Sequence, residues 1–208
     1  MTLQERTYSN IDLVRQKTDG VLLFLSLGKD SLVLLDMIYP KFERIVCVFM
    51  YFVKSLEHIE RWVGWVKAKY PKIEFVQVPH WNLTYILRGG LYCVPNPKVK
   101  LLKLADVVKA MQLKYGLYYT FLGMKKADGM NRRLMLKGYE ANGYENNGMC
   151  YPLADWTQAE RTTRAGKIFA QSQFRRRIQL GLHVMAGEEL PPGFTKNLQG
   201  VPDGNTCA

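Results

Sequence analysis

The chain of 208 residues is 48% hydrophobic and 23% charged, a composition typical of globular proteins. Its 29 Lys and Arg outnumber its 18 Asp and Glu and give a formal net charge of +11, which favours polyanionic partners such as nucleotides or nucleic acid. Charged residues interrupt every apolar run before it reaches the length of a membrane span, and the polar, acid-containing N-terminus does not resemble a secretory signal. The sequence therefore argues against a membrane protein and predicts a cytoplasmic one.

Apolar periodicity predicts strands that alternate with helices. The predicted strands are residues 21–25, 44–52, 72–79 and 117–124. The predicted helices lie in residues 1–19 and 32–38, between an N-cap at Ser55 and Pro71, at about 101–115, in a basic segment ending near 138, and from about 157. Residues 80–100 and 142–148 are rich in turn formers and predict loops. This order predicts a parallel sheet with helices on both faces.

The composition changes after residue 157. Residues 158–208 combine a cluster of Arg and Lys with many Pro and Gly, and they contain no motif. We expect residues 158–208 to be a basic, partly helical and irregular extension of the domain formed by residues 1–157. The chain is short for two domains.

The 4 cysteines and 3 histidines give no signal for a metal or redox site. No two cysteines form a Cys-x-x-Cys pair, and the histidines lack the spacing of metal ligands. The sequence predicts neither a zinc site nor a thioredoxin-type pair, and it leaves the oligomeric state open, a homo-oligomer included.

The first candidate site is the turn after the first predicted strand, residues 26–31. Such a turn lies where a strand ends and a helix begins, which is where phosphates bind in open α/β sheets. Gly28 allows close approach of the backbone to an anion, Lys29 supplies a positive charge, and Asp30 is a candidate N-cap. The P-loop of kinases and GTPases is excluded, because its first Gly is absent here and Asp30 follows Lys29 where that motif has Ser or Thr. The alternative is a buried strand, turn and helix with no ligand.

The second candidate site is residues 122–133, which also follow a predicted strand and therefore belong to the same sheet edge. Its cations are Lys125, Lys126, Arg132 and Arg133. Four cations beside one acid suit a triphosphate or pyrophosphate, since Arg contacts phosphate oxygens in pairs and Lys provides a point charge. The alternative is a basic surface turn and helix.

Three segments resemble a known superfamily. Residues 26–31 resemble the Ser-Gly-Gly-x-Asp-Ser signature of the PP-loop ATP pyrophosphatases, or adenine nucleotide α-hydrolases, with Leu27 in place of the first Gly. Residues 122–133 are similar to the Gly-x-Arg/Lys-Lys/Arg-x-Asp/Glu-x-x-x-Arg region of the phosphoadenosine phosphosulfate reductase-like family. Residues 151–157 resemble the Pro-Leu-x-x-Trp-Thr segment of that family.

The resemblance implies a doubly wound α/β fold with a parallel five-stranded sheet and ATP at the strand ends. It implies an enzyme that cleaves the bond between the α- and β-phosphates, adenylylates an anionic acceptor and releases pyrophosphate, with Mg²⁺ to neutralise the phosphates. Asp30 and Asp128 are candidates to position the ion, but the spacing assigns neither of them. Lys29 and Asp30 would be the catalytic residues. The implied nucleotide-binding residues are Ser26, Leu27, Gly28, Lys29, Asp30 and Ser31 in the first turn and Gly123, Lys125, Lys126, Arg132 and Arg133 in the second.

Two other functions stay open. A sulfonucleotide reductase needs a thiolate, but Cys207 lacks the adjacent Gly-x-His of the reductases. A second departure is that Met50–Val53 contains no acid, whereas the family often has an Asp there that helps to bind the adenosine. A non-catalytic accessory protein that binds nucleotides or nucleic acid is favoured by Leu27 and the basic C-terminal part. The acceptor cannot be identified from the sequence, and nucleic acid remains a candidate partner.

Overall fold

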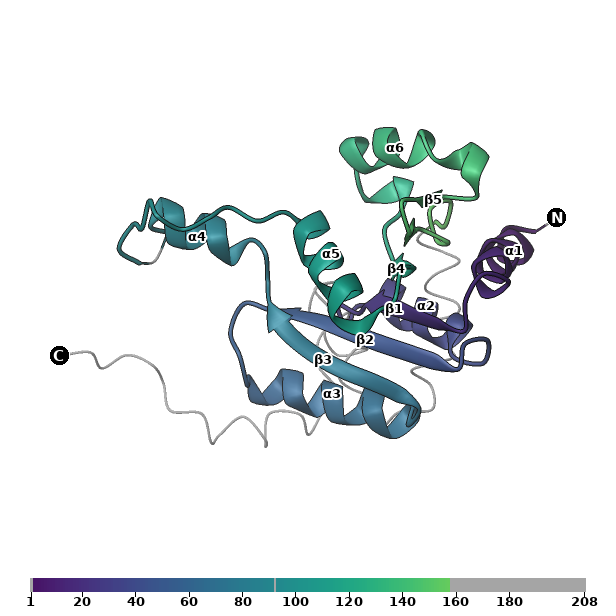
Figure 1. Ribbon diagram of the computed structural model, residues 1–208, viewed down its shortest axis with the longest axis horizontal. Coiled ribbons are helices and arrows are strands. Elements are labelled where there is room, and N and C mark those ends of the chain that lie inside the picture. The colour runs from purple at the N-terminus through teal and green to yellow at the C-terminus, as the bar shows by residue number, and fades with distance from the viewer. Residues whose placement is uncertain (1, 92, 158–208) are drawn as a thin grey trace, which may run out of the picture. The chain divides into compact units, whose positions relative to one another are not determined.

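The computed structural model describes residues 2–91 and 93–157, which contain one sheet flanked by helices (Figure 1). The strands are β1 (Gly20–Phe24), β2 (Arg44–Tyr51), β3 (Ile73–Pro79), β4 (Thr120–Leu122), β5 (Glu145–Asn146) and β6 (Met149–Cys150). The helices are α1 (Leu3–Arg15), α2 (Lys29–Ile38), α3 (Glu57–Lys69), α4 (Leu83–Gly89), α5 (Leu104–Tyr115) and α6 (Met130–Lys137), with 3-10 turns η1 (Lys126–Asp128) and η2 (Glu140–Asn142).

The sheet has the order β3-β2-β1-β4-β6-β5. Strands β1, β2, β3, β4 and β6 pair in parallel, and β5 pairs with β6 in the antiparallel direction. This arrangement confirms the predicted doubly wound α/β fold. The sixth strand comes from a hairpin in residues 145–150, whose two-residue strands are too short to show an alternating pattern in the sequence.

The connections determine which helix covers which face of the sheet. The crossovers from β1 to β2 and from β2 to β3 run in one direction, so right-handed connections place α2 and α3 on the same face. The return from β3 to β4 places α5 on the other face, and Figure 1 shows α3 and α5 on opposite sides of the sheet. The core beneath α5 includes Leu22, Phe24, Val46, Val48 and Val108.

The direction in which successive strands are added to the sheet reverses between β1 and β4, although the two strands are parallel. From β1 the chain proceeds outward through β2 and β3, and it then returns to add β4 on the other side of β1. Ligands of open α/β sheets bind at such a switch point, beyond the carboxyl ends of the strands. The two candidate turns follow these two neighbouring strands.

Two predicted N-caps are wrong. Helix α2 begins after Gly28, so Asp30 lies in its first turn. Helix α3 begins after Leu56, and Ser55 adopts a positive φ of 61° one residue earlier. Residues 80–100, predicted as loop, contain α4. The helix predicted from about 157 lies outside the described residues. Within residues 2–91 and 93–157, no helix is both long and apolar enough to cross a membrane.

Candidate functional site

Serine hydroxyls fix the shape of the turn between β1 and α2. The Ser26 hydroxyl accepts a hydrogen bond from the Gly28 N–H at 3.3 Å, and the Ser31 hydroxyl donates to the Gly28 carbonyl at 3.0 Å. The two hydroxyl oxygens lie 3.1 Å apart. The turn is therefore held closed on itself at the N-terminus of α2, where the first backbone N–H groups lack partners within the helix and favour an anion.

Leu27 adopts a left-handed backbone conformation in this turn, with φ of 60°. This conformation costs an L-residue with a side chain about 1–2 kcal/mol, whereas glycine adopts it readily. The signature that the turn resembles has Gly here. The chain thus has a leucine in a backbone conformation that favours glycine, at a cost in backbone strain.

The second turn lies directly against the first. A Cβ atom placed on Gly123, just after β4, would lie 3.3 Å from the backbone nitrogen of Ser31 and 3.4 Å from the carbonyl carbon of Asp30. Glycine therefore permits the end of β4 to approach the first turn of α2. An ion pair of 2.5 Å between Lys125 Nζ and Asp30 Oδ2 joins the two turns.

Lys125 is buried between two carboxylates. Its side chain is 2% exposed, and its ammonium group also contacts Asp128 at 2.9 Å. Asp128 accepts a further hydrogen bond from the Lys125 N–H and lies 3.7 Å from Arg132. Partial burial raises the pKa of Asp128, but the hydrogen bonds and positive charges of Lys125 and Arg132 outweigh it, so the pKa lies below its usual value. Lys125 therefore joins the two turns and is already neutralised by both carboxylates.

Lys126 belongs to a separate polar cluster. Its ammonium group pairs with Glu140 and contacts the Tyr144 hydroxyl and the Asp155 carboxylate, each of the latter at 2.9 Å. Partial burial lowers the pKa of Lys126, but these three hydrogen bonds outweigh it and raise the pKa overall. Burial raises the pKa of Tyr144 to about 12, so its hydroxyl stays protonated and donates to Asp155 at 2.7 Å. This cluster fixes the back of the second turn.

Helix α1 is joined to the same cluster. Arg6 pairs with Asp155 at 3.2 Å, and the Trp156 indole N–H donates to the Thr7 hydroxyl at 2.8 Å. The Lys126 N–H donates to the Ala154 carbonyl at 2.8 Å. The first helix, residues 151–156 and the second turn are thus connected by direct hydrogen bonds.

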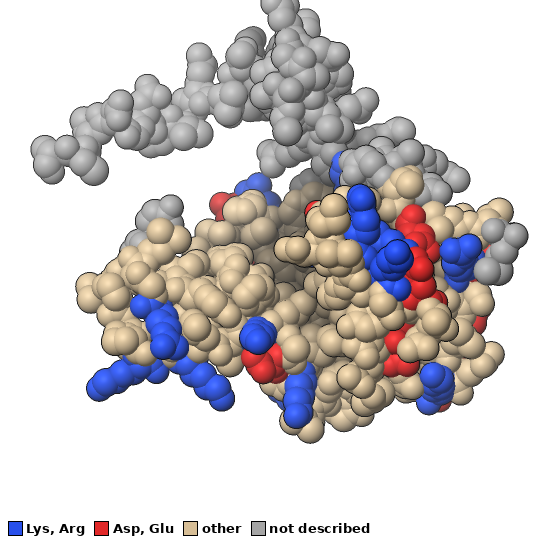
Figure 2. Space-filling view, turned by 90° about the horizontal axis from the view of Figure 1, so that it is seen from above, with Lys and Arg blue, Asp and Glu red and all other residues tan. Residues whose placement is uncertain are grey.

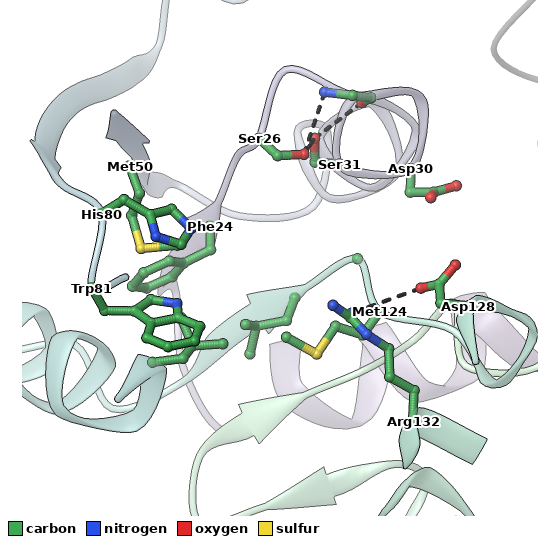
Figure 3. Close-up of a pocket in the computed structure, with 14 residues that line it drawn as sticks. Phe24, Ser26, Asp30, Ser31, Met50, His80, Trp81, Met124, Asp128 and Arg132 are labelled. Atoms are coloured by element: carbon green, nitrogen blue, oxygen red, sulfur yellow. Dashed lines mark hydrogen bonds and ion pairs between the residues drawn. The ribbon is translucent and has the colours of Figure 1, made fainter. Parts of the chain in front are cut away.

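A cavity of about 480 Å³ opens between the two turns. Its polar half is lined by Ser26, Gly28, Asp30, Ser31, Asp128 and Arg132. Its apolar half is lined by Phe24, Met50, His80, Trp81, Leu104, Leu122 and Met124. Figure 3 shows His80 and Trp81 together at one end and Asp30, Asp128 and Arg132 at the other. In Figure 2 the surface is hollowed near its middle, with acidic and basic side chains mixed along one side of the hollow.

The structure brings part of the predicted nucleotide-binding set into the cavity. The predicted residues that line it are Ser26, Gly28, Asp30, Ser31, Gly123 and Arg132. The predicted residues that do not line it are Leu27, Lys29, Lys125, Lys126 and Arg133. Both second-turn lysines are instead committed to carboxylates, which leaves Arg132 as the second-turn cation on the cavity wall.

The aromatic residues in the apolar half of the cavity were not predicted from the sequence. His80 and Trp81 follow Pro79, the last residue of β3, and their rings stack at 5.4 Å with an interplanar angle of 30°. His80 also stacks on Phe52 at 4.3 Å, and burial lowers its pKa, which favours the neutral imidazole at pH 7. The sequence signal that could have indicated them is the pair of aromatic residues directly after a predicted strand.

The described residues contain no cluster of three or more His, Cys, Asp or Glu that could hold a metal ion by itself. Cys47 and Cys150 are buried, and burial raises the pKa of the Cys47 thiol to about 12, so it is not a reactive thiolate. Cys207, the thiol that a sulfonucleotide reductase would need, lies outside the described residues.

The carboxylate clusters predict how stability depends on pH. The pKa values of Asp128, Glu140 and Asp155 lie below their ordinary values of 3.8, 4.5 and 3.8. A lowered pKa in the folded state stabilises the protein above the unfolded pKa, and this stability is lost as the pH falls through the folded pKa. Because burial also lowers the pKa of His80, we expect the urea midpoint to begin to fall below about pH 6.5 and to fall more steeply below about pH 4.5, where the carboxylates become protonated.

Lys126→Met is the control for this pH dependence. The variant lacks the cation that lowers the pKa of Glu140 and Asp155, so its midpoint is expected to fall less steeply in acid than that of the wild type. Parallel acid profiles for the two proteins would contradict the assignment.

The chain is similar to known proteins in structure but not in sequence. No protein-family model matches the sequence, and no curated protein matches it. The NH3-dependent NAD synthetase from Campylobacter jejuni is similar in structure, with a TM-score of 0.53 and 16% identity over 90% of this chain and 85% of that chain. The glutamine-dependent NAD+ synthetase from Acinetobacter baumannii, in complex with ADP, has a TM-score of 0.50 and 16% identity over 82% of this chain and 33% of that chain. The U34-tRNA thiolase from Methanococcus maripaludis has a TM-score of 0.48 and 14% identity over 81% of this chain and 64% of that chain.

At these identities the similarity establishes the fold and not the activity. The likeness extends over most of this chain, and it does not single out the phosphoadenosine phosphosulfate reductase-like family. The chain therefore has an adenine nucleotide α-hydrolase-like fold, with its cavity at the position where β1 and β4 end.

Proposed function

We propose that the chain binds ATP in this cavity and transfers its adenylyl group to an acceptor, releasing pyrophosphate. The single observation that carries the proposal is the division of one cavity into a polar half and an aromatic half at the switch point of the sheet. A nucleotide has the same division, since its phosphates are anionic and its base is flat and largely apolar.

The phosphates fit the polar half. The N-terminus of α2, the hydroxyls of Ser26 and Ser31, and the guanidinium of Arg132 all belong to that half. Helix N-termini and serine hydroxyls donate hydrogen bonds to phosphate oxygens, and Arg contacts two such oxygens at once.

The base fits the aromatic half. The Trp81 ring, which stacks on His80, offers a flat face at which a purine ring can stack, and Met50 and Phe24 complete an apolar wall. The separation of the two halves across the cavity matches a ligand with a charged end and an aromatic end.

The charges of the polar half support a role for Mg²⁺. Asp30 and Asp128 are balanced by Lys125 and Arg132, so these four side chains carry no net formal charge and leave a polyphosphate unneutralised. Mg²⁺ is bound in proteins by one or two carboxylates together with substrate phosphates, and Asp30 and Asp128 are carboxylates of this kind on the cavity wall. The bound ion would neutralise charge that develops on the phosphates.

The reaction requires the protein mainly to orient the acceptor and the phosphates. An anionic oxygen of the acceptor, which carries no proton to be removed, attacks the α-phosphorus and forms a new O–P bond. The bond from the α-phosphorus to the bridging oxygen breaks, and pyrophosphate leaves with the electron pair. Ser26, Ser31 and Arg132 would hold the phosphates in line for this displacement. Lys29 is the first residue of α2 and does not line the cavity, so we propose that it assists the departing pyrophosphate through its charge alone.

Product analysis tests the proposal. ATP labelled at the α-phosphate in one reaction and at the γ-phosphate in another is incubated with the full chain and Mg²⁺. We expect labelled AMP, free or attached to an acceptor, and labelled pyrophosphate. Release of ADP and inorganic phosphate would contradict α–β cleavage, and the absence of calorimetric binding of an α,β-methylene ATP analogue would contradict the nucleotide site itself.

Leu27 gives a prediction that combines stability and binding. Leu27→Gly is expected to raise the free energy of unfolding by about 0.5–1 kcal/mol, because relief of the left-handed strain exceeds the entropy cost of glycine. It should also tighten binding of the ATP analogue, because the backbone can approach the phosphates more closely. Leu27→Val should lower stability, since a β-branched residue tolerates a positive φ less well than leucine. Equal urea midpoints for the two variants would contradict the strain argument.

A further inference from the structure

The segment between β3 and α5 carries positive charge without acidic partners. Residues 75–105 contain no Asp or Glu. Their cations are Arg88, Lys98, Lys100 and Lys103, all exposed. None of these side chains forms an ion pair with a carboxylate of residues 2–91 or 93–157, whereas Lys125 and Lys126 each pair with two. Excess positive charge of this kind attracts a polyanion.

A row of four aromatic rings in contact with one another connects the cavity with this segment. Phe52 stacks on His80 at 4.3 Å, His80 on Trp81 at 5.4 Å, and Trp81 meets Tyr85 edge to face at 5.8 Å. His80 and Trp81 line the cavity, while Phe52 is 49% exposed and Tyr85 is 42% exposed. We call these four rings and the four cations the aromatic-basic strip.

We propose that the aromatic-basic strip binds single-stranded RNA. Proteins bind single strands by combining cations along the phosphate backbone with aromatic side chains on which the bases stack, and the strip offers both. RNA loops and ends present unpaired bases, whereas the bases of a duplex are stacked inside it and cannot reach Phe52 or Tyr85. Charge complementarity and accessible rings therefore favour an unpaired RNA segment as the occupant.

The strip is continuous with the cavity, so RNA bound to the strip lies next to the proposed site of adenylyl transfer. Since His80 and Trp81 belong to both, a strand on the strip would bring one of its nucleotides to the mouth of the cavity. RNA is then the acceptor class for the adenylyl transfer. This assignment of the acceptor rests on the proposed function, whereas the binding of RNA to the strip does not.

Fluorescence anisotropy with a labelled oligouridylate tests the binding. The full chain is titrated without ATP, so that a defect in the nucleotide site and a defect in RNA binding are measured separately. We expect binding that weakens with salt, and an RNA duplex of equal length that binds at least about tenfold more weakly, because stacking on the rings is lost. Equal affinity for the duplex would overturn the proposal.

Matched variants test the two halves of the strip. Lys98→Gln/Lys100→Gln is expected to lower the slope of log affinity against log salt by about 1.4, since each phosphate contact on a single strand contributes about 0.7. Lys109→Gln/Lys114→Gln removes the same charge from exposed positions of α5 outside the strip and should leave the slope nearly unchanged. Equal effects of the two double variants would overturn the proposal.

Tyr85 tests the aromatic contribution. Tyr85→Ala is expected to weaken oligouridylate binding at least about fivefold, whereas Tyr85→Phe keeps the ring and should retain the affinity. An unchanged affinity of Tyr85→Ala for RNA, together with a loss of its sedimentation with anionic phospholipid vesicles, would overturn the proposal and identify the strip as a lipid-binding surface.

Discussion

Arg132→Ala is expected to lower the rate of AMP and pyrophosphate release by about 100-fold, the loss usual for one charged or hydrogen-bonding group that stabilises a transition state. Arg132 is the second-turn cation that lines the cavity, and it belongs to the polar half that we propose for the phosphates. Its pairing with Asp128 at 3.7 Å is loose enough to leave guanidinium N–H groups for a ligand. Calorimetric titration of the ATP analogue and the two-label product assay measure binding and release separately.

Arg133→Ala is the matched control. Arg133 is the next residue on α6 and is exposed, but it does not line the cavity. The same loss of charge at the adjacent position should leave release within about twofold of the wild type, because an exposed charge outside the site is largely screened. Equal losses in the two variants would show that general positive charge, and not the position of Arg132, determines binding.

Lys125→Met is expected to lower the free energy of unfolding by about 3 kcal/mol. The variant keeps the volume of the side chain but removes the ammonium group between Asp30 and Asp128, so that two carboxylates face each other in a partly buried position. Removing one partner of a buried ion pair is costly because the remaining charge has already lost its water. Urea denaturation at pH 7 measures the change.

A second substitution distinguishes charge from packing. Asp30→Asn in the Lys125→Met background removes one of the two carboxylate charges and should restore part of the lost stability. Lys109→Met changes an exposed lysine on α5 and is expected to alter stability by less than about 0.5 kcal/mol. If the double variant were no more stable than Lys125→Met, loss of packing and not charge repulsion would explain the effect.

The fold could be predicted from the sequence because its strands are apolar and nearly fully buried. All five residues of β1 are buried, and α2 follows it with an almost continuous apolar sequence. The two turns that follow β1 and β4 could be placed on one edge because parallel strands end together. A hairpin of two-residue strands leaves no such pattern, and β5 and β6 were therefore missed.

The partners of the second-turn cations could not be predicted. Four cations in a short segment look alike in a sequence, yet Lys125 turns inward to Asp30 while Lys126 turns to Glu140 and Asp155. Those carboxylates lie 95, 14 and 29 positions away along the chain, so only the folded structure brings them into contact. The cavity-facing role of Arg132 depends on this choice of partners.

Helix α1 helps to hold the second turn in place, although it lies outside the cavity. No residue of α1 lines the cavity, but Arg6 and Thr7 bind Asp155 and Trp156, and Asp155 in turn binds Lys126 behind the second turn. Shortening the chain at its amino end would remove these anchors and loosen the turn that carries Asp128. A version of the protein trimmed there for expression would thus keep every cavity-lining residue and still lose the alignment of the wall that carries Asp128.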